Sequence, residues 1–247
     1  MPTDSRVLRR HGIFVTGTDT GIGKTTISCA LLLALRSHGL CASGMKPVAS
    51  GCRTTPLGLR NEDAEALIAA SNPAPSYADC NPFALTEPIA PHLAARHDRT
   101  EISLARLSDA YGKLASSADC VVVEGVGGWS VPLSDQLMQV DLVRALDLPV
   151  ILVVGLRLGC LNHALLSARA IEADGCALLG WVGNRIDPSM DRADENLAAL
   201  RNRLRAPCLG VLPYSDAGDD RDLAPHLAAA CAALQASGPS TLAVPGR

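Results

Sequence analysis

A glycine-rich turn between an apolar stretch and an amphipathic stretch restricts the fold of this chain more than any other feature. Residues 13–15 read Ile-Phe-Val and predict a strand, and residues 24–38 predict a helix that ends at Gly39. Glycines between them let backbone N–H groups and the positive end of the helix converge on an anion. We therefore expect a phosphate-binding loop in which Lys24 reaches the β- and γ-phosphates and the Thr25 hydroxyl binds Mg²⁺.

The turn departs by one residue from the strict pattern G-x-x-x-x-G-K-[ST]. Gly17 lies six positions before Gly23 instead of five, and Thr18 stands where the first glycine is expected. The alternative is an ordinary strand–turn–helix whose loop only caps the helix. The order of strand, loop, Gly-Lys-Thr-Thr and helix favours the phosphate loop.

Short apolar runs alternate with amphipathic stretches along the rest of the chain. Strands are expected near residues 41–45, 120–123, 149–154, 176–182 and 209–211, and helices after the N-cap Asn61 and over residues 103–117, 161–173 and 191–203. Residues 51–58 are predicted to be a loop, and residues 77–91, with three prolines, an irregular excursion. Strands separated by helices imply parallel pairing through crossovers.

This pattern predicts an α/β fold of the P-loop NTPase type, with one mainly parallel sheet flanked by helices. We expect a single domain over residues 11–235, because no change in composition divides the chain. Residues 1–10 are expected to be a flexible tail, and residues 236–247, rich in Ser, Gly and Pro, a disordered one.

Composition excludes several classes of protein. Of 247 residues, 22 are basic and 25 acidic, a net charge of -3 that gives no electrostatic footprint for nucleic acid. The nine cysteines form no C-x-x-C pair, which favours a reducing, cytoplasmic compartment over a disulfide framework or a zinc site. Residues 1–10 lack the apolar core of a signal peptide, and the longest apolar run, residues 148–156, is too short to span a membrane.

A second acidic candidate stands at the end of an apolar run. Residues 121–124 read Val-Val-Val-Glu and are followed by small residues. In a nucleotide-binding sheet, Glu124 is expected beside the phosphate loop, where it binds Mg²⁺ directly or through water. The alternative is a strand-terminal glutamate that faces solvent, which the phosphate loop makes less favourable.

Seven segments together resemble the motifs of the dethiobiotin synthetase family. They are GTDTGIGKT at residues 17–25, GMKPVASG at 44–51, LRNEDA at 59–64, EPIAPH at 87–92, VEGVGGW at 123–129, LGCLNH at 158–163 and GWVGN at 180–184. The matches run in order over most of the chain, from Phe14 to about Pro213. As a set they are highly specific, whereas singly only the first three are.

The resemblance implies a homodimeric ligase of biotin biosynthesis that depends on ATP and Mg²⁺. Such an enzyme carboxylates 7,8-diaminononanoate with CO₂ and closes the ureido ring, giving dethiobiotin, ADP and phosphate. The implied intermediates are a carbamate and a carbamic-phosphoric anhydride, and no protein nucleophile is needed. The main demands of such phosphoryl transfer are positioning and charge neutralisation.

The resemblance also implies a role for individual residues. Lys46 and Lys24 are the catalytic lysines, and Thr25, Asp63 and Glu124 surround Mg²⁺. The nucleotide is expected to contact Thr20, Gly21, Ile22, Gly23, Lys24, Thr25, Thr26, Asp63, Glu124, Gly125, Val126, Gly127, Asn184, Arg185, Pro213, Tyr214 and Ser215. The diamine or its carbamate is expected to contact Lys46, Ser50, Gly159 and Asn162. Without the surrounding motifs, a lysine at the end of a strand, such as Lys46, or an aspartate in the first turn of a helix, such as Asp63, is more often a solvated surface charge.

Three positions depart from the family pattern. Gly21 stands where many relatives have glutamate, Arg157 replaces a lysine, and Asn196 replaces a tyrosine that reaches the substrate of the partner subunit. The change at Gly21 concerns the affinity of the loop for the nucleotide. The last removes the contact expected across the dimer.

Two other functions fit parts of the pattern. A regulatory ATPase of the partitioning or cell-division type carries a lysine five positions before the Gly-Lys-Thr lysine, where this chain has Asp19. An amidating synthetase of the cobyrinate type needs a glutaminase domain, for which 247 residues leave no room. A non-catalytic nucleotide-binding module conflicts with the complete set of expected magnesium ligands.

Overall fold

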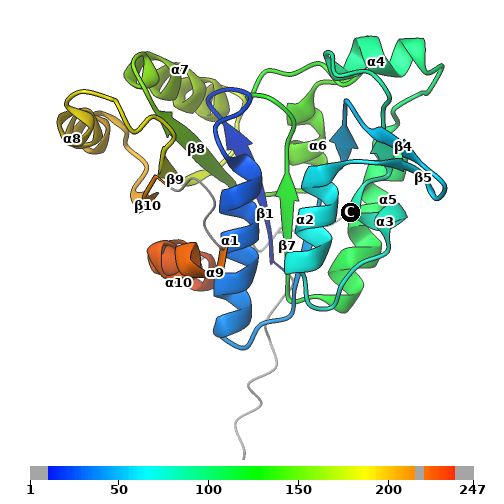
Figure 1. The fold of residues 1–247 in the computed structure, drawn as a ribbon, viewed down its shortest axis with the longest axis horizontal. Helices are drawn as coiled ribbons and strands as arrows, with labels where there is room; N and C mark the ends of the chain where they lie inside the picture. The colour runs from blue at the N-terminus through cyan, green and yellow to red at the C-terminus, as the bar shows by residue number, and fades with distance from the viewer. Residues whose placement is uncertain (1–10, 215–219, 237–247) are drawn as a thin grey trace, which may run out of the picture.

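The centre of the molecule is a six-stranded sheet in the order β10-β9-β8-β1-β7-β2, and all its strands are parallel (Figure 1). The structure, a computed structural model, describes residues 11–214 and 220–236. The strands are β1 (His11–Gly17), β2 (Ala42–Met45), β7 (Cys120–Glu124), β8 (Val150–Leu156), β9 (Leu178–Arg185) and β10 (Cys208–Leu212). The predicted α/β fold with a mainly parallel sheet is confirmed.

Helices cover both faces of this sheet. One face carries α1 (Lys24–Ser37), α2 (Glu62–Ala70), α9 (Asp220–Leu223), the 3₁₀ helix η1 (Ala224–Leu227) and α10 (Ala228–Ala236). The other carries α5 (Leu104–Ser117), α6 (Gln139–Ala145), α7 (Cys160–Ala173) and α8 (Ala193–Arg203). In Figure 1, α1 and α2 lie in front of the sheet, and α5 and α6 lie behind it.

Successive side chains of each central strand enter the two hydrophobic layers in turn. Ile13 and Val15 of β1 pack with α1, whereas Phe14 between them packs on the opposite face against Trp129. All five residues of β7 and all seven of β8 are buried. Two covered faces therefore explain why these strands appear in the sequence as continuous apolar runs.

Apart from α2, the chain between β2 and α5 forms a lobe beside the sheet. Its β3 (Val48–Ala49) and β6 (Phe83–Ala84) pair in parallel, β4 (Arg53–Thr55) and β5 (Gly58–Arg60) form an antiparallel hairpin, and α3 (Tyr77–Cys80) and α4 (Pro91–His97) complete it. A small hydrophobic cluster that includes Phe83, Leu85 and Leu107 holds the lobe together. Where the lobe begins, Lys46 contacts Glu124 at the end of β7.

Two local expectations are wrong in this lobe. Residues 51–58 were expected as a loop, but they contain β4 and the start of β5, joined by a turn in which the Thr55 hydroxyl donates to Gly58 O at 2.7 Å. Residues 77–91 are not irregular throughout, because they contain α3 and β6. Elements of two to four residues are too short to show a period in the sequence.

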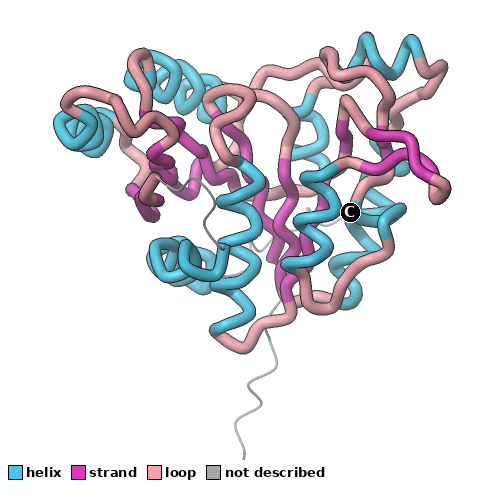
Figure 2. The backbone as a smooth tube through the Cα atoms, in the orientation of Figure 1, coloured by secondary structure: helices cyan, strands magenta, loops and turns pink. Residues whose placement is uncertain are grey.

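The loops that follow the strands gather at the carboxyl edge of the sheet, the upper edge in Figure 2. This edge is where open parallel sheets bind ligands. The expected helix caps are present: Asn61 accepts a hydrogen bond from Ala64 N–H at 3.2 Å, and Gly39 follows α1 with a φ of 81°. Within the described residues, no helix has the length and apolar character needed to cross a membrane.

Candidate active site

The loop between β1 and α1 has the geometry of an anion-binding site. Gly23, with a φ of 83°, precedes the first residue of α1 and has no side chain to cap the helix. Thr18 N–H donates to Val153 O at 3.0 Å, which ties the loop to β8. The free N–H groups at the start of α1 therefore point toward the loop, as binding of a phosphate requires.

Lys24 is enclosed by this loop. Its ammonium donates to Asp19 O at 2.8 Å, and only 7% of the residue is exposed. Burial, followed by the nearby charge of Lys46, lowers the pKa of Lys24 to about 8. A second anionic group beside Lys24 would keep it protonated.

Four of the predicted residues meet at the ends of β2 and β7. Lys46, one residue after β2, donates from Nζ to Glu124 Oε1 at 2.6 Å and to Asp63 Oδ2 at 2.8 Å. Thr25 Oγ1 donates to the same Glu124 oxygen at 2.9 Å. The sequence placed these residues on separate segments, and the structure joins them in one cluster of Thr25, Lys46, Asp63 and Glu124, below called the Lys46 cluster.

The charges of the Lys46 cluster support one another. Burial acts to lower the pKa of Lys46, but Glu124 and Asp63 outweigh it, so the pKa is raised. Burial acts in the opposite direction on Asp63, and Lys46 outweighs it, so the pKa of that carboxyl is lowered. Lys46 is therefore held in its charged form.

Two buried oxygens of predicted site residues have no hydrogen-bond partner among the described residues. They are Glu124 Oε2 and Ser50 Oγ, the latter just after β3. Buried polar atoms are nearly always hydrogen-bonded in native proteins. Both oxygens are therefore available to a ligand, and Ser50 is where the sequence predicted a substrate contact.

Asn184, the penultimate residue of β9, lies against the phosphate loop. Its Nδ2 donates to Ile22 O at 2.9 Å, and a Cβ added at Gly23 would lie 2.2 Å from the same nitrogen. Arg185, the next residue, forms an ion pair with Asp194. The amide of Asn184 is thus in place beside the loop, whereas the guanidinium of Arg185 is directed to α8.

The remaining predicted residues also lie after strands at the carboxyl edge. Gly159 precedes α7 with a φ of 95°, and Asn162 is exposed in the first turn of that helix. Gly125, Val126 and Gly127 follow β7, and Lys46 Nζ lies 3.4 Å from Gly125 O. Pro213 and Tyr214 follow β10 and are exposed, while Ser215 lies outside the described residues.

Comparison with known proteins shows the family. The model of the AAA domain family matches residues 11–220. A protein of Xanthomonas oryzae named ATP-dependent dethiobiotin synthetase BioD is 60% identical over 81% of this chain and 90% of its own length. Proteins of the same name from Xanthomonas euvesicatoria and Xylella fastidiosa are each 57% identical, over 86% and 83% of this chain and 95% and 91% of their own lengths.

The chain belongs to the dethiobiotin synthetase family. The resemblance of the seven sequence motifs to this family is confirmed.

Solved structures of other P-loop proteins share the fold. The MinC:MinD complex of Aquifex aeolicus matches with a TM-score of 0.54 at 14% identity, covering 96% of this chain and 98% of its own. A ParA family ATPase of Chlorobium tepidum matches with a TM-score of 0.50 at 17% identity, over 94% of each chain. At these identities the likeness concerns the fold alone, so it does not favour the regulatory-ATPase alternative.

Sequence reasoning missed two residues that shape this family member's site. Asp19 holds Lys24 through its carbonyl and forms an ion pair with Arg157, at the end of β8, through its carboxylate. Gln139, buried at the start of α6, accepts from Val126 N–H and donates to Gly128 O, each at 2.8 Å. Asp19 lies in the matched segment at residues 17–25, where it was used only against the regulatory-ATPase alternative. Only chain folding brings Gln139 to the loop after β7, and no local pattern marks it.

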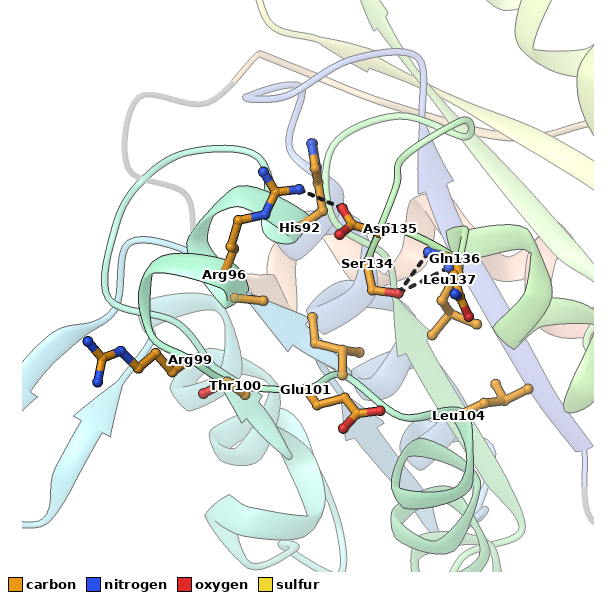
Figure 3. Close-up of a pocket in the computed structure, with 12 residues that line it drawn as sticks. His92, Arg96, Arg99, Thr100, Glu101, Leu104, Ser134, Asp135, Gln136 and Leu137 are labelled. Carbon is orange, nitrogen blue, oxygen red and sulfur yellow. Dashed lines mark hydrogen bonds and ion pairs between the residues drawn. The ribbon is translucent and has the colours of Figure 1, made fainter.

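A pocket of about 640 Å³ lies apart from the Lys46 cluster, between α4 and residues 134–137 (Figure 3). His92, Glu101 and Leu104 contribute to its lining, and Arg96 pairs with Asp135 across it at 2.6 Å. None of the residues predicted to bind nucleotide or diamine lines it. His92 is therefore the only residue of the motif at residues 87–92 that lines this pocket.

Proposed function

We infer that this chain is a ligase that makes dethiobiotin in biotin biosynthesis, with ATP and 7,8-diaminononanoate as substrates. Relatives 55–60% identical over most of the chain carry the name ATP-dependent dethiobiotin synthetase. The structural observation that supports this inference is the Lys46 cluster. It lies beside a phosphate loop, in a chain closely similar to these enzymes.

The proposed reaction has three steps, with CO₂ as the third substrate. One amine of the diamine attacks CO₂ and loses a proton to give a carbamate. A carbamate oxygen then attacks the γ-phosphorus of ATP and displaces ADP, giving a carbamic-phosphoric anhydride. The second amine attacks the carbonyl carbon and expels phosphate, which closes the ureido ring.

Lys24 and Lys46 supply positive charge to these steps. Lys24 lies inside the phosphate loop, where its ammonium can follow the γ-phosphate as the bond to ADP breaks. Lys46 follows β2 and binds the Glu124 oxygen that Thr25 also contacts, so it is suited to hold the carbamate against the phosphate. Donors fixed in advance at developing negative charge are among the largest contributions to catalysis.

The Lys46 cluster has the chemistry of a magnesium site. Mg²⁺ prefers oxygen ligands and is usually held by one or two carboxylates, with phosphates and water completing its shell. Thr25 Oγ1, Asp63 Oδ2 and Glu124 Oε1 converge here around a positive charge, that of Lys46, and Glu124 Oε2 lacks a partner. Among the described residues, no three or more His, Cys, Asp or Glu side chains are grouped so that they could hold a metal ion by themselves. We propose Mg²⁺ held by Thr25, Asp63 and Glu124, where it would neutralise phosphate charge.

The remaining residues are assigned as the resemblance to the family implies. The nucleotide phosphates would contact Thr20, Gly21, Ile22, Gly23, Lys24, Thr25 and Thr26, and Gly125, Val126 and Gly127 would flank them. Asn184, Arg185, Pro213, Tyr214 and Ser215 would surround the base. Ser50 would bind the diamine or its carbamate, and Gly159 and Asn162 its carboxylate end. The exposed start of α7 supports the last assignment.

A homodimer in the cytoplasm is part of the same proposal. Leu158 is 95% exposed beside Gly159, an apolar side chain suited to a subunit contact near the substrate. The nine cysteines include no C-x-x-C pair, a spacing that favours a reducing compartment. Sedimentation velocity of the purified chain tests the dimer, because a monomer at micromolar concentration would contradict it.

Fixation of radiolabelled bicarbonate tests the reaction itself. Mg-ATP and the labelled bicarbonate are incubated with the protein, with and without 7,8-diaminononanoate. A carbamate loses CO₂ in acid, whereas a closed ureido ring keeps it. We expect acid-stable label that requires the diamine and matches the phosphate released. No label despite bound nucleotide would overturn the proposal.

A further inference from the structure

Both backbone groups of Lys46 are held by the segment that contains α3. Lys46 N–H donates to Cys80 O at 2.8 Å, and Asn81 Nδ2 donates to Lys46 O at 2.7 Å. Asn81 is only 3% exposed. A lysine at the end of a strand is thus fixed from a part of the chain 35 residues away.

Tyr77 connects this support to the helix that carries Asp63. The Tyr77 hydroxyl donates to Asn81 Oδ1 at 3.0 Å and accepts from Asn61 N–H at 2.8 Å. Asn61 is the N-cap of α2, and Asp63 stands in the first turn of the same helix. The Tyr77 ring is held in turn by the guanidinium of Arg60, 4.1 Å from its centre.

These contacts close into a ring. From Lys46 O it passes through Asn81, Tyr77 and Asn61 to the first turn of α2, and it returns through the Asp63 carboxylate to Lys46 Nζ. The backbone of Lys46 and its side chain are therefore bound to the two ends of one hydrogen-bonded chain. The ring fixes the distance between the lysine and the carboxylate.

We propose that Tyr77 is a positioning residue for the ligase reaction, which sets Lys46 against Asp63 through this ring. The inference rests on the proposed function of Lys46. Tyr77 has no contact with the phosphate loop in the ring, so its hydroxyl acts on the chemical step more than on nucleotide binding. Misplacement of a catalytic group by about 1 Å can cost about 100-fold in rate.

The test is Tyr77→Phe, which deletes one oxygen and keeps the ring stack on Arg60. We expect kcat to fall by about 10- to 100-fold, with KM for Mg-ATP changed less than kcat, because the loop at residues 18–23 is outside the ring and Asp63 is the only proposed magnesium ligand within it. The matched control is Tyr111→Phe, which deletes the same atom from a half-buried tyrosine on α5. That variant is expected to keep wild-type kcat.

A double-mutant cycle that combines Tyr77→Phe with Asn81→Ala tests whether the loss of kcat arises from the broken ring. Each single change breaks the same ring at a different link, so the double variant should lose little more than the worse single variant. Equal kcat for Tyr77→Phe and Tyr111→Phe, or losses that simply add in the double variant, would overturn the proposal. Wild-type protein that fixes no label would instead refute the proposed function, so the two failures can be told apart.

Discussion

The ammonium of Lys46 lies 2.6 Å from Oε1 of Glu124, a carboxylate with no exposed surface. Thr25 and Asp63 reach the same place from α1 and α2. A buried ion pair of this kind is costly to break, because removal of one partner leaves the other as an unpaired buried charge. The pair therefore links the stability of the fold to the chemistry of the site.

Lys46→Met should abolish most activity and also destabilise the protein. We expect a loss of about 3–5 kcal/mol in the free energy of unfolding, because Glu124 is left buried and unpaired. Urea unfolding followed by circular dichroism measures this loss. The double variant Lys46→Met, Glu124→Gln should regain most of it, since the unpaired charge is then absent.

A matched control is Lys113→Met, which removes the ion pairs of an exposed lysine with Asp109 on α5 and Asp79 on α3. Surface pairs contribute little, so its unfolding midpoint should equal that of wild type. Addition of Mg²⁺ should raise the melting temperature of Lys46→Met more than that of wild type, because the vacated carboxylates can then bind the cation. Equal shifts would contradict the assignment of Asp63 and Glu124 to the metal.

The affinity for Mg-ATP should fall as pH rises above 8. The free protein holds Lys24 with a pKa of about 8, below its ordinary value of 10.5. Above pH 8 the free protein loses this charge, and the nucleotide must restore it by proton uptake on binding. Calorimetric titrations between pH 7 and 9.5 should show Kd rising about tenfold per pH unit once pH exceeds 8.

Lys24→Arg provides the control for this dependence. Arginine keeps its charge throughout this range, so the slope of Kd against pH should disappear whatever the absolute affinity. A wild-type Kd that stays constant to pH 9.5 would show that Lys24 does not meet the phosphates. Proton uptake, measured in buffers of different ionisation enthalpy, should likewise be lost in the variant.

Two glycines of the phosphate loop should respond differently to alanine. Both have positive φ, 71° at Gly21 and 83° at Gly23, so each substitution carries about 1 kcal/mol of backbone strain. A Cβ at Gly21 meets nothing within 4 Å, whereas one at Gly23 would lie 2.2 Å from Asn184 Nδ2. Gly23→Ala should therefore weaken ATP binding at least tenfold more than Gly21→Ala.

The same pair of variants tests the departure at Gly21. Open space around it means that the position also accepts a larger side chain, such as glutamate. Gly21→Glu should fold, and ATP titration should show an altered affinity. Equal effects of Gly21→Ala and Gly23→Ala would indicate that φ alone matters and that the Asn184 contact does not.

Ser50→Ala should separate stability from substrate binding. The Ser50 hydroxyl oxygen is buried without a partner, so its removal leaves no group unpaired and the melting temperature should not fall. If this oxygen binds the diamine or its carbamate, KM for the diamine should rise about tenfold, the loss of one hydrogen bond. An unchanged KM for the diamine would remove Ser50 from the site.

The sheet could be predicted because its strands are buried on both faces. Residues 121–123 are apolar throughout, and Glu124 marks the point where that run reaches the carboxyl edge. The phosphate loop was recognisable for a similar reason, since strand, glycines and lysine are contiguous in the chain. Local sequence is sufficient where one segment contains the whole feature.

Features that join distant segments could not be predicted in this way. The ring through Tyr77 and Asn81 joins segments around residues 46, 61 and 77–81, and its spacing depends on how the lobe folds. Helix α10 was not predicted either, because Ala228–Ala236 is apolar almost throughout and shows no amphipathic period. Helix α6 is only seven residues long, close to the limit at which a period is visible.

The order of the strands also sets the distance between the two ends of the site, Asn184 and Lys46. Asn184 is the penultimate residue of β9 and Lys46 follows β2, four strand spacings apart in the order β9-β8-β1-β7-β2. At about 4.8 Å per spacing, these positions are separated by about 19 Å along the edge. Backbone hydrogen bonds between the strands maintain this span. Substitutions on the helices can therefore change which ligand binds at either end of the site, but not the length of ligand that fits between the two ends.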